Sequence, residues 1–131
     1  DAVQARRVRP FLNNQIPTFA TSQVNDGRAD PLTNSDLNGI RFVDMPWFVQ
    51  PDHPAVMIYS RPANLSAELQ RLYALGIDAC RIAGELLAGY QRISLDGVTG
   101  RVLLRSGTSL QREPVQALFR DGAAAAVEDR R

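Results

Sequence analysis

The stretch from Ser66 to Gly89 constrains the fold more than any other part of the sequence. Its apolar side chains recur at intervals of three and four residues, which is the spacing of one face of an α-helix. They are Leu69, Leu72, Tyr73, Gly76, Cys80, Ala83 and Leu87. Ser66 is a good N-cap residue, Glu68 suits the first turn, and Gly89 suits the position after the helix. The pattern predicts a long, largely buried helix over 66–88, and Gly76 leaves open a division into two shorter helices.

The segments on either side of this helix have shorter patterns. A further helix is expected over 2–13, and a long polar loop over 22–38. Strands are expected over 16–21, 39–45, 93–95, 101–105, 110–112 and 115–119. Four prolines predict an extended crossing segment over 46–65, and they leave regular structure open only at 55–59. Helices and strands in this order favour an α/β domain with helices packed on a sheet. The opening helix has no strand before it, so we expect a fragment of a larger domain.

The titratable and nucleophilic side chains exclude several chemistries. All fifteen basic residues are arginine, which excludes a Schiff base and a lysine phosphate loop. Cys80 is the only cysteine and His53 the only histidine, which excludes an internal disulfide and a multi-cysteine or two-histidine site within one chain. The fourteen acids leave a formal charge of +1, with no basic stripe for nucleic acid. We therefore expect no enzyme, no cofactor, no metal site and no nucleic-acid partner.

Three residues are candidates for a ligand cleft: Ser22, Asp44 and Trp47. The two polar residues lie at the ends of expected strands, and ligands in open α/β sheets gather beyond the carboxyl ends of strands. The simpler interpretation makes Ser22 and Asp44 caps or turn residues and Trp47 a cover over the core. Cys80 is expected to be a small buried hydrophobe, and His53 an exposed loop residue.

Two further patterns have both a functional and a structural interpretation. Residues 96–100, with the sequence DGVTG, contain glycines but do not match the dinucleotide-binding fingerprint, so a turn is favoured over a phosphate loop. Arg6, Arg7 and Arg9 would suit phosphate or an acidic partner, although a solvated helix face is the favoured interpretation.

Several strings in a fixed order carry a family resemblance. The most specific are GIRF and DMPW within 39–47, and LYALGIDA at 72–79. With PTFATSQ, ISLDGVTGRVLL and ALFRDG, they resemble the C-terminal part of the penicillin-binding-protein activator lipoproteins, the LppC/LpoA family. The resemblance extends over 5–122. More broadly, residues 76–79 followed by the turn at 96–100 resemble the closing section of type I periplasmic-binding-protein folds.

The resemblance implies a fold and a role. The fold is a fragment of a two-lobed, type I periplasmic-binding-protein-like (Rossmann-like) α/β domain, with helices packed on a mainly parallel sheet. It would occupy 1–122, with a crossing between lobes near 46–65 and a disordered tail at 123–131. The role is that of a non-catalytic regulator of peptidoglycan synthesis. It would bind and activate a class A penicillin-binding protein from the periplasmic face of the outer membrane.

The resemblance also implies how the chain meets membranes and partners. Attachment to the membrane would require a lipid anchor absent from this chain, so the fragment itself is expected to be soluble. Peptidoglycan fragments are a second candidate partner. Self-association is expected, because an isolated fragment exposes surface that missing strands would cover. The alternative function is a periplasmic solute-binding or sensory domain that holds a small ligand between its lobes.

Overall fold

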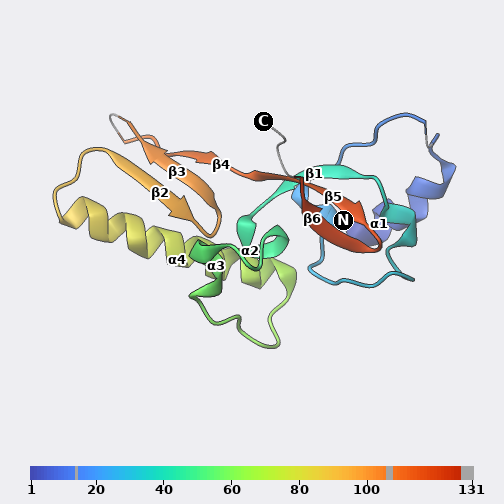
Figure 1. Cartoon of the computed structure of the whole chain (residues 1–131), viewed down its shortest axis with the longest axis horizontal. Coiled ribbons are helices and arrows are strands. Elements are labelled where there is room, and N and C mark those ends of the chain that lie inside the picture. The colour runs from blue at the N-terminus through green and yellow to red at the C-terminus, as the bar shows by residue number, and fades with distance from the viewer. Residues whose placement is uncertain (14, 106–107, 128–131) are drawn as a thin grey trace. The chain divides into compact units, whose positions relative to one another are not determined.

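A computed structural model describes residues 1–13, 15–105 and 108–127. The chain divides into two compact units, each with its own sheet. The first unit comprises Asp1–Asp44 and Val115–Arg131, and the second comprises Met45–Pro114. The chain therefore enters the second unit after Asp44 and returns to the first at Val115 (Figure 1).

The first unit combines short helical elements with a three-stranded sheet. The helical elements are α1 (Ala2–Val8), η1 (Arg9–Phe11), η2 (Ser22–Val24) and η3 (Ser35–Leu37). The strands are β1 (Arg41–Asp44), β5 (Val115–Arg120) and β6 (Ala123–Ala126), in the order β1-β5-β6. The buried apolar residues include Leu37 and Ile40, and the rings of Phe42 and Phe119 lie 5.3 Å apart between their centroids. The alternating burial of β1 is that of a strand with one face on the core.

The long polar loop of the first unit is organised around the turn between β5 and β6. Asp121 and Gly122 both have positive φ, 51° and 73°, as the two central residues of a type I′ hairpin turn require. The Gly122 carbonyl accepts from the Asn34 Nδ2 at 2.9 Å, and the Gly122 N–H donates to the Asn38 Oδ1 at 3.1 Å. Hydrogen bonds to this turn therefore hold the loop, whose regular structure is limited to the short η2 and η3.

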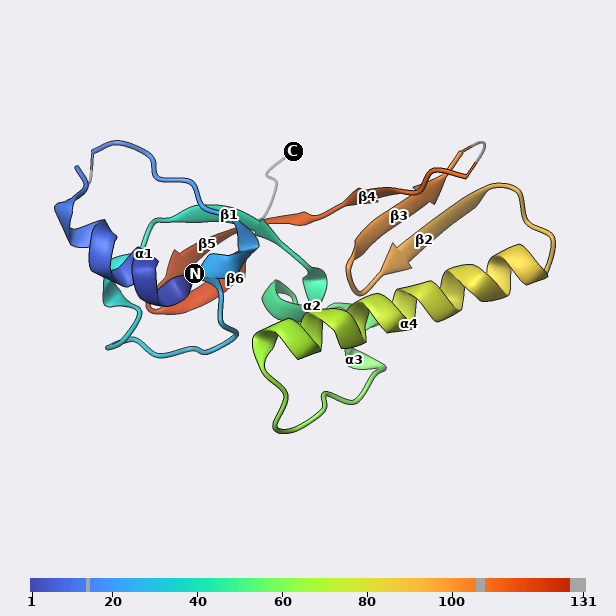
Figure 2. The same ribbon diagram turned by 180° about the vertical axis from the view of Figure 1, so that it is seen from behind.

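The second unit is built on one long helix and a second three-stranded sheet. Its helices are α2 (Pro46–Val49), α3 (Pro54–Met57) and α4 (Ala67–Leu87). Its strands are β2 (Ile93–Gly97), β3 (Gly100–Leu104) and β4 (Gln111–Glu113), in the order β2-β3-β4. In both views α4 runs alongside the β2–β3 hairpin (Figures 1 and 2). The core of the unit is Trp47, Val56, Ala74 and Val98.

The boundaries of α4 confirm the capping signals in the sequence. The Ser66 hydroxyl accepts from the Leu69 N–H at 3.4 Å, and Gly89 adopts a φ of +88° just beyond the helix. The helix continues through Gly76 as one element. The division that Gly76 left open does not occur.

Both sheets are antiparallel, so the expected mainly parallel sheet is not what the described residues form. Two-residue turns join β2 to β3 and β5 to β6, and connections that short can join only antiparallel strands. Among the described residues, parallel pairing is limited to an isolated bridge between Phe19 and Arg41.

Three local predictions are wrong. Residues 16–21 form no strand beyond the bridge at Phe19. Pro46, expected in an extended segment, begins a four-residue helix, because proline has a suitable φ and needs no donor in a first turn. Pro54 begins a second such helix, most of which lies in the range 55–59 where the sequence leaves regular structure open. Residues 123–126, expected in a disordered tail, form β6, because the Asp-Gly turn returns the chain along β5. The end of that expected tail, 128–131, lies outside the described residues.

Candidate functional site

Ser22 and Asp44 both lie in the first unit. Ser22 begins η2 and is half-buried, whereas Asp44 ends β1 with only 3% of its surface exposed. Asn25, the residue after η2, donates from its Nδ2 to the Asp44 Oδ2 at 3.0 Å. The structure thus joins Asp44 to the loop that begins at Ser22, and the role of both residues in a ligand cleft stays a prediction.

Trp47 lies in the second unit, at the centre of its core. Its backbone N–H donates to the Val98 carbonyl at 3.0 Å, and its Nε1 donates to the Gln70 Oε1 at 3.3 Å. The Arg61 guanidinium donates to the Trp47 carbonyl oxygen, and its central carbon lies 4.7 Å from the centroid of the indole ring. Partial burial lowers the pKa of Arg61. Trp47 therefore serves as a core residue, and its part in a cleft also stays a prediction.

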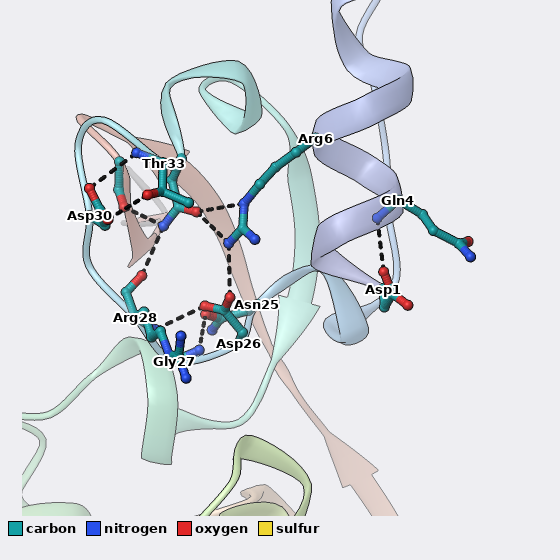
Figure 3. Close-up of polar contacts among 11 residues, drawn as sticks. Asp1, Gln4, Arg6, Asn25, Asp26, Gly27, Arg28, Asp30 and Thr33 are labelled. Carbon is teal, nitrogen blue, oxygen red and sulfur yellow. Dashed lines mark hydrogen bonds and ion pairs between the residues drawn. The ribbon is translucent and has the colours of Figure 1, made fainter.

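A polar network that the sequence did not predict ties α1 to the loop of the first unit. The Arg6 side chain reaches from α1 to that loop (Figure 3). Its Nη2 lies 2.8 Å from the Asp26 Oδ2 and 2.7 Å from the Asn34 Oδ1, and its Nε lies 3.1 Å from the same oxygen. Asn34 is itself buried, so this charge-assisted contact fills its remaining acceptor. The solvated face expected for Arg6, Arg7 and Arg9 is found only at Arg7, because Arg6 is half-buried and Arg9 is buried.

A buried carboxylate is the centre of a hydrogen-bond network in the second unit. Asp78 lies in the middle of α4 and is 1% exposed. Its Oδ1 accepts from the Val98 N–H at 3.1 Å, and its Oδ2 accepts from the Thr99 N–H at 2.8 Å and from the Thr99 hydroxyl at 2.7 Å. Arg81 also lies near it, with Nη1 3.5 Å from the Asp78 Oδ1. The turn between β2 and β3 is thereby fixed to the long helix.

The Asp78 contact explains the glycine-containing sequence at 96–100. In this sequence the backbone N–H groups of Val98 and Thr99 bind the carboxylate of Asp78, which agrees with a turn and not with a phosphate loop. A Cβ at Gly97 would overlap the Asp78 carboxylate, and one at Gly100 would overlap the Glu113 carbonyl oxygen. The signal for this contact in the sequence is an acid in the middle of the helix pattern, which local periodicity does not pair with a turn some twenty residues away.

The apolar face of α4 is exposed, which corrects the prediction of a largely buried helix. Only Ala74 and Asp78 of this helix are buried. We define the outward face of α4 by three exposed leucines on the side away from Asp78: Leu69, Leu72 and Leu87. A groove of about 500 Å³ runs beside it, lined by Leu75 and Leu86 of the helix and on the sheet side by Val102 and Leu110. Full burial of a leucine side chain stabilises a folded protein by roughly 1.5–3 kcal/mol. Exposure of this face therefore forgoes several kcal/mol, which is a large share of the total free energy of unfolding of a domain, about 5–15 kcal/mol.

Cys80 and His53 also differ from their predicted environments. Cys80 is exposed, because it lies on the side of α4 that faces away from the core of the unit. His53 is partly buried and caps α3, with its Nδ1 accepting from the Ala55 N–H at 3.2 Å. Its Nε2 lies 3.7 Å from the Asp96 Oδ2. Within the described residues no group of acids, histidines or cysteines could hold a metal ion, and no helix is long and apolar enough to cross a membrane.

Comparison with known sequences gives a family match over nearly the whole chain. The family model described as "LppC putative lipoprotein" matches residues 1–122. A relative from Haemophilus influenzae, named "Penicillin-binding protein activator LpoA", is 26% identical over 92% of this chain and 22% of its own length. A relative of the same name from Vibrio antiquarius is 35% identical over 81% of this chain and 19% of its own length. The chain thus spans about a fifth of the length of these relatives.

Two solved structures are similar to the chain. One is described as the "Structure of a putative branched-chain amino acid ABC transporter from Chromobacterium violaceum ATCC 12472"; it is 43% identical, with a TM-score of 0.75, over 91% of this chain and 40% of that one. The other is the C-domain of Haemophilus influenzae LpoA, described as "a regulator of PBP1A". It has a TM-score of 0.70 over 98% of this chain and 42% of that one, and at 23% identity this likeness shows the fold alone.

Proposed function

The chain belongs to the LppC lipoprotein family, and from that premise we propose that its parent protein binds and activates a penicillin-binding protein. The observation that carries the proposal is the family match over residues 1–122, together with relatives that share the name of penicillin-binding protein activator. Those names describe a regulatory role. The chain is accordingly proposed to act by binding and not by catalysis.

The finer proposal concerns the partner and the place. The partner is a class A penicillin-binding protein, reached from the periplasmic face of the outer membrane, with the protein held there by a lipid anchor. Peptidoglycan fragments are a second proposed ligand. The all-arginine set of cations supports a binding role, because the planar guanidinium pairs with carboxylates through two parallel hydrogen bonds.

A binding experiment with the full-length protein tests this proposal. Immobilised class A penicillin-binding protein from the same organism should retain the protein at moderate salt, and a class B enzyme should not. Retention by neither enzyme, with protein shown to be folded, would contradict the proposal. Retention by both would remove the class A assignment.

A second candidate function is that of a periplasmic solute-binding or sensory domain. It is favoured by the 43% identity to the Chromobacterium violaceum chain described as a branched-chain amino acid transporter. Ser22, Asp44 and Trp47 are the proposed cleft residues, and leucine, isoleucine and valine are the ligands to test first. A ligand at one hundred times its Kd stabilises the folded state by about 2.7 kcal/mol, which raises Tm by several degrees. An unchanged Tm across these amino acids and a panel of muropeptides would contradict this function.

The proposed arrangement of the parent domain is two-lobed and periplasmic-binding-protein-like. Residues 46–65 would contain a crossing between the lobes, and each unit would contribute to one lobe. The isolated 131-residue chain is then proposed to self-associate, because it presents the outward face of α4 to water. Light scattering over a concentration series should show a rising mass, and a constant monomer mass would contradict self-association.

A further inference from the structure

The first unit contains a pocket of about 400 Å³, a size within the usual range for small-molecule sites. Its lining comes from residues 9–10 and 16–18 on one side, and from residues between 35 and 39 on the other. The short helices η1 and η3, which supply part of each side, contact each other. The pocket is therefore formed by segments of one unit alone.

The pocket lies at the opposite end of its strand segments from the candidate cleft residues. Phe19 and Arg41 form a parallel bridge, so the two segments that pass through them run in the same direction. Thr18, which lines the pocket, precedes this bridge, whereas Ser22 and Asp44 follow it. Ligands of open α/β sheets gather beyond the carboxyl ends of strands. A site at the amino ends is thus distinct from the candidate cleft.

The lining of the pocket carries one charge of each sign. Arg9 begins η1 and is only 8% exposed, so most of its surface is shielded from water. Asp36 lies in η3 and is exposed. A guanidinium has five N–H donors in a planar fork that matches a carboxylate, and shielding from water strengthens such a pair. These five donors let Arg9 bind a ligand carboxylate in addition to its contacts within the chain.

The two hydroxyl groups of the lining add acceptors. The Thr18 hydroxyl donates to the Ile16 carbonyl at 3.4 Å, and the Ser35 hydroxyl donates to the Leu32 carbonyl at 3.0 Å. Each hydroxyl has a single proton, so it can offer a ligand only its lone pairs. Together with the Asp36 carboxylate, these oxygens suit a ligand group that donates several hydrogen bonds, such as an ammonium.

We propose that this pocket binds a zwitterion, either a free amino acid or a short peptide, with its carboxylate on Arg9 and its ammonium on Asp36. Pro10, Ile16 and Pro17 supply an apolar part of the lining, which suits an apolar side chain on the ligand. A phosphate would be repelled by Asp36, and a simple amine would be repelled by Arg9. The proposal does not depend on the partner enzyme.

An NMR titration of the isotope-labelled chain tests the proposal with two probes, leucine and the dipeptide alanyl-leucine. Zwitterion binding should shift the amide signals of Thr18 and Gly39 in a saturable manner, and the probe that binds more tightly identifies the source of the ligand. Blocked forms of each probe are the matched controls, because N-acetylation removes the ammonium and amidation removes the carboxylate. Each block should raise the Kd roughly tenfold or more, because it removes one hydrogen-bonded charge pair.

Matched variants assign each charge of the ligand to its partner. Arg9→Gln should raise the Kd of the zwitterion roughly tenfold or more without weakening the amidated form further, and exposed Arg7→Gln is its control. Asp36→Asn should also weaken the zwitterion, but it should not weaken the N-acetylated form further, and exposed Asp52→Asn is its control. Because Asp36 is exposed, its variant remains a test even if Arg9→Gln disturbs the fold.

Three results would overturn the proposal. In the first, neither probe gives a saturable shift although the chain is folded. In the second, the blocked forms bind as tightly as the zwitterions. In the third, the shifts gather at Ser22 and Asp44, and Ser22→Ala weakens binding whereas the variants of Arg9 and Asp36 do not. That third result would support the second candidate function and place the ligand in the candidate cleft.

Discussion

Replacing Asp78 tests how the second unit is held together. Asp78→Ala removes the acceptor for the Val98 N–H, the Thr99 N–H and the Thr99 hydroxyl. A buried donor left without a partner costs about 1–3 kcal/mol, so the two amides alone imply a loss of about 2–6 kcal/mol. Relief of the desolvation of the buried carboxylate offsets part of this. The expected loss in the free energy of unfolding is therefore about 3 kcal/mol.

Fluorescence of Trp47 is the assay for this prediction. Trp47 is the only tryptophan, it is fully buried in the core of the same unit, and its backbone N–H donates to the turn at Val98. Urea titrations of the parent and of Asp78→Ala then report the stability of the second unit itself. Asp52→Ala is the control, because Asp52 is an exposed acid of that unit, and it should stay within about 0.5 kcal/mol of the parent. A loss below about 1 kcal/mol for Asp78→Ala would show that Asp78 does not hold the turn between β2 and β3.

Three other predictions concern both units. Arg6→Ala removes three side-chain hydrogen bonds and should weaken hydrogen-exchange protection of β1 by about 1–2 kcal/mol, whereas exposed Arg7→Ala should have no effect; equal effects would contradict this. Gly100→Ala adds a Cβ at a φ of +126° that overlaps a carbonyl oxygen and should cost about 2 kcal/mol or more in the Trp47 assay, so an unchanged urea midpoint would contradict it. Hydrogen bonds from the side chain and then the backbone of Thr33 lower the pKa of Asp30, so its contribution to stability is complete above the ordinary pKa and is lost as pH falls through the lowered one. Thr33→Val should raise the pKa of Asp30 in an NMR titration, and an unchanged pKa would contradict the assigned cause.

Helix ends, strands and tight turns are the features of the fold that the sequence predicts well. Ser66 and Gly89 bound α4 as their capping preferences require, and the strands at 93–97 and 100–104 enclose a turn at 98–99, inside the predicted 96–100. The strand at Arg41–Asp44 also lies within its predicted range. These features depend on residues only a few positions apart, so a single sequence contains all the information that they need.

Burial and pairing are less accessible from the sequence, because they depend on residues far apart along the chain or outside it. The periodicity of α4 predicts a helix correctly, yet it does not say that most of the apolar side chains of that helix are exposed. The Asp78 and Arg6 networks join residues twenty or more positions apart, and no local spacing connects their members. The candidate cleft residues show the same limit, since Asp44 and Trp47 belong to different units.

The most direct test of the proposed function is the rate of peptidoglycan synthesis. A purified class A penicillin-binding protein from the same organism is given lipid-linked precursor, with and without the full-length protein that carries this chain. We predict a several-fold increase in the rate that saturates with added protein, and no synthesis by the added protein alone. An unchanged rate at saturating, folded protein would contradict this prediction.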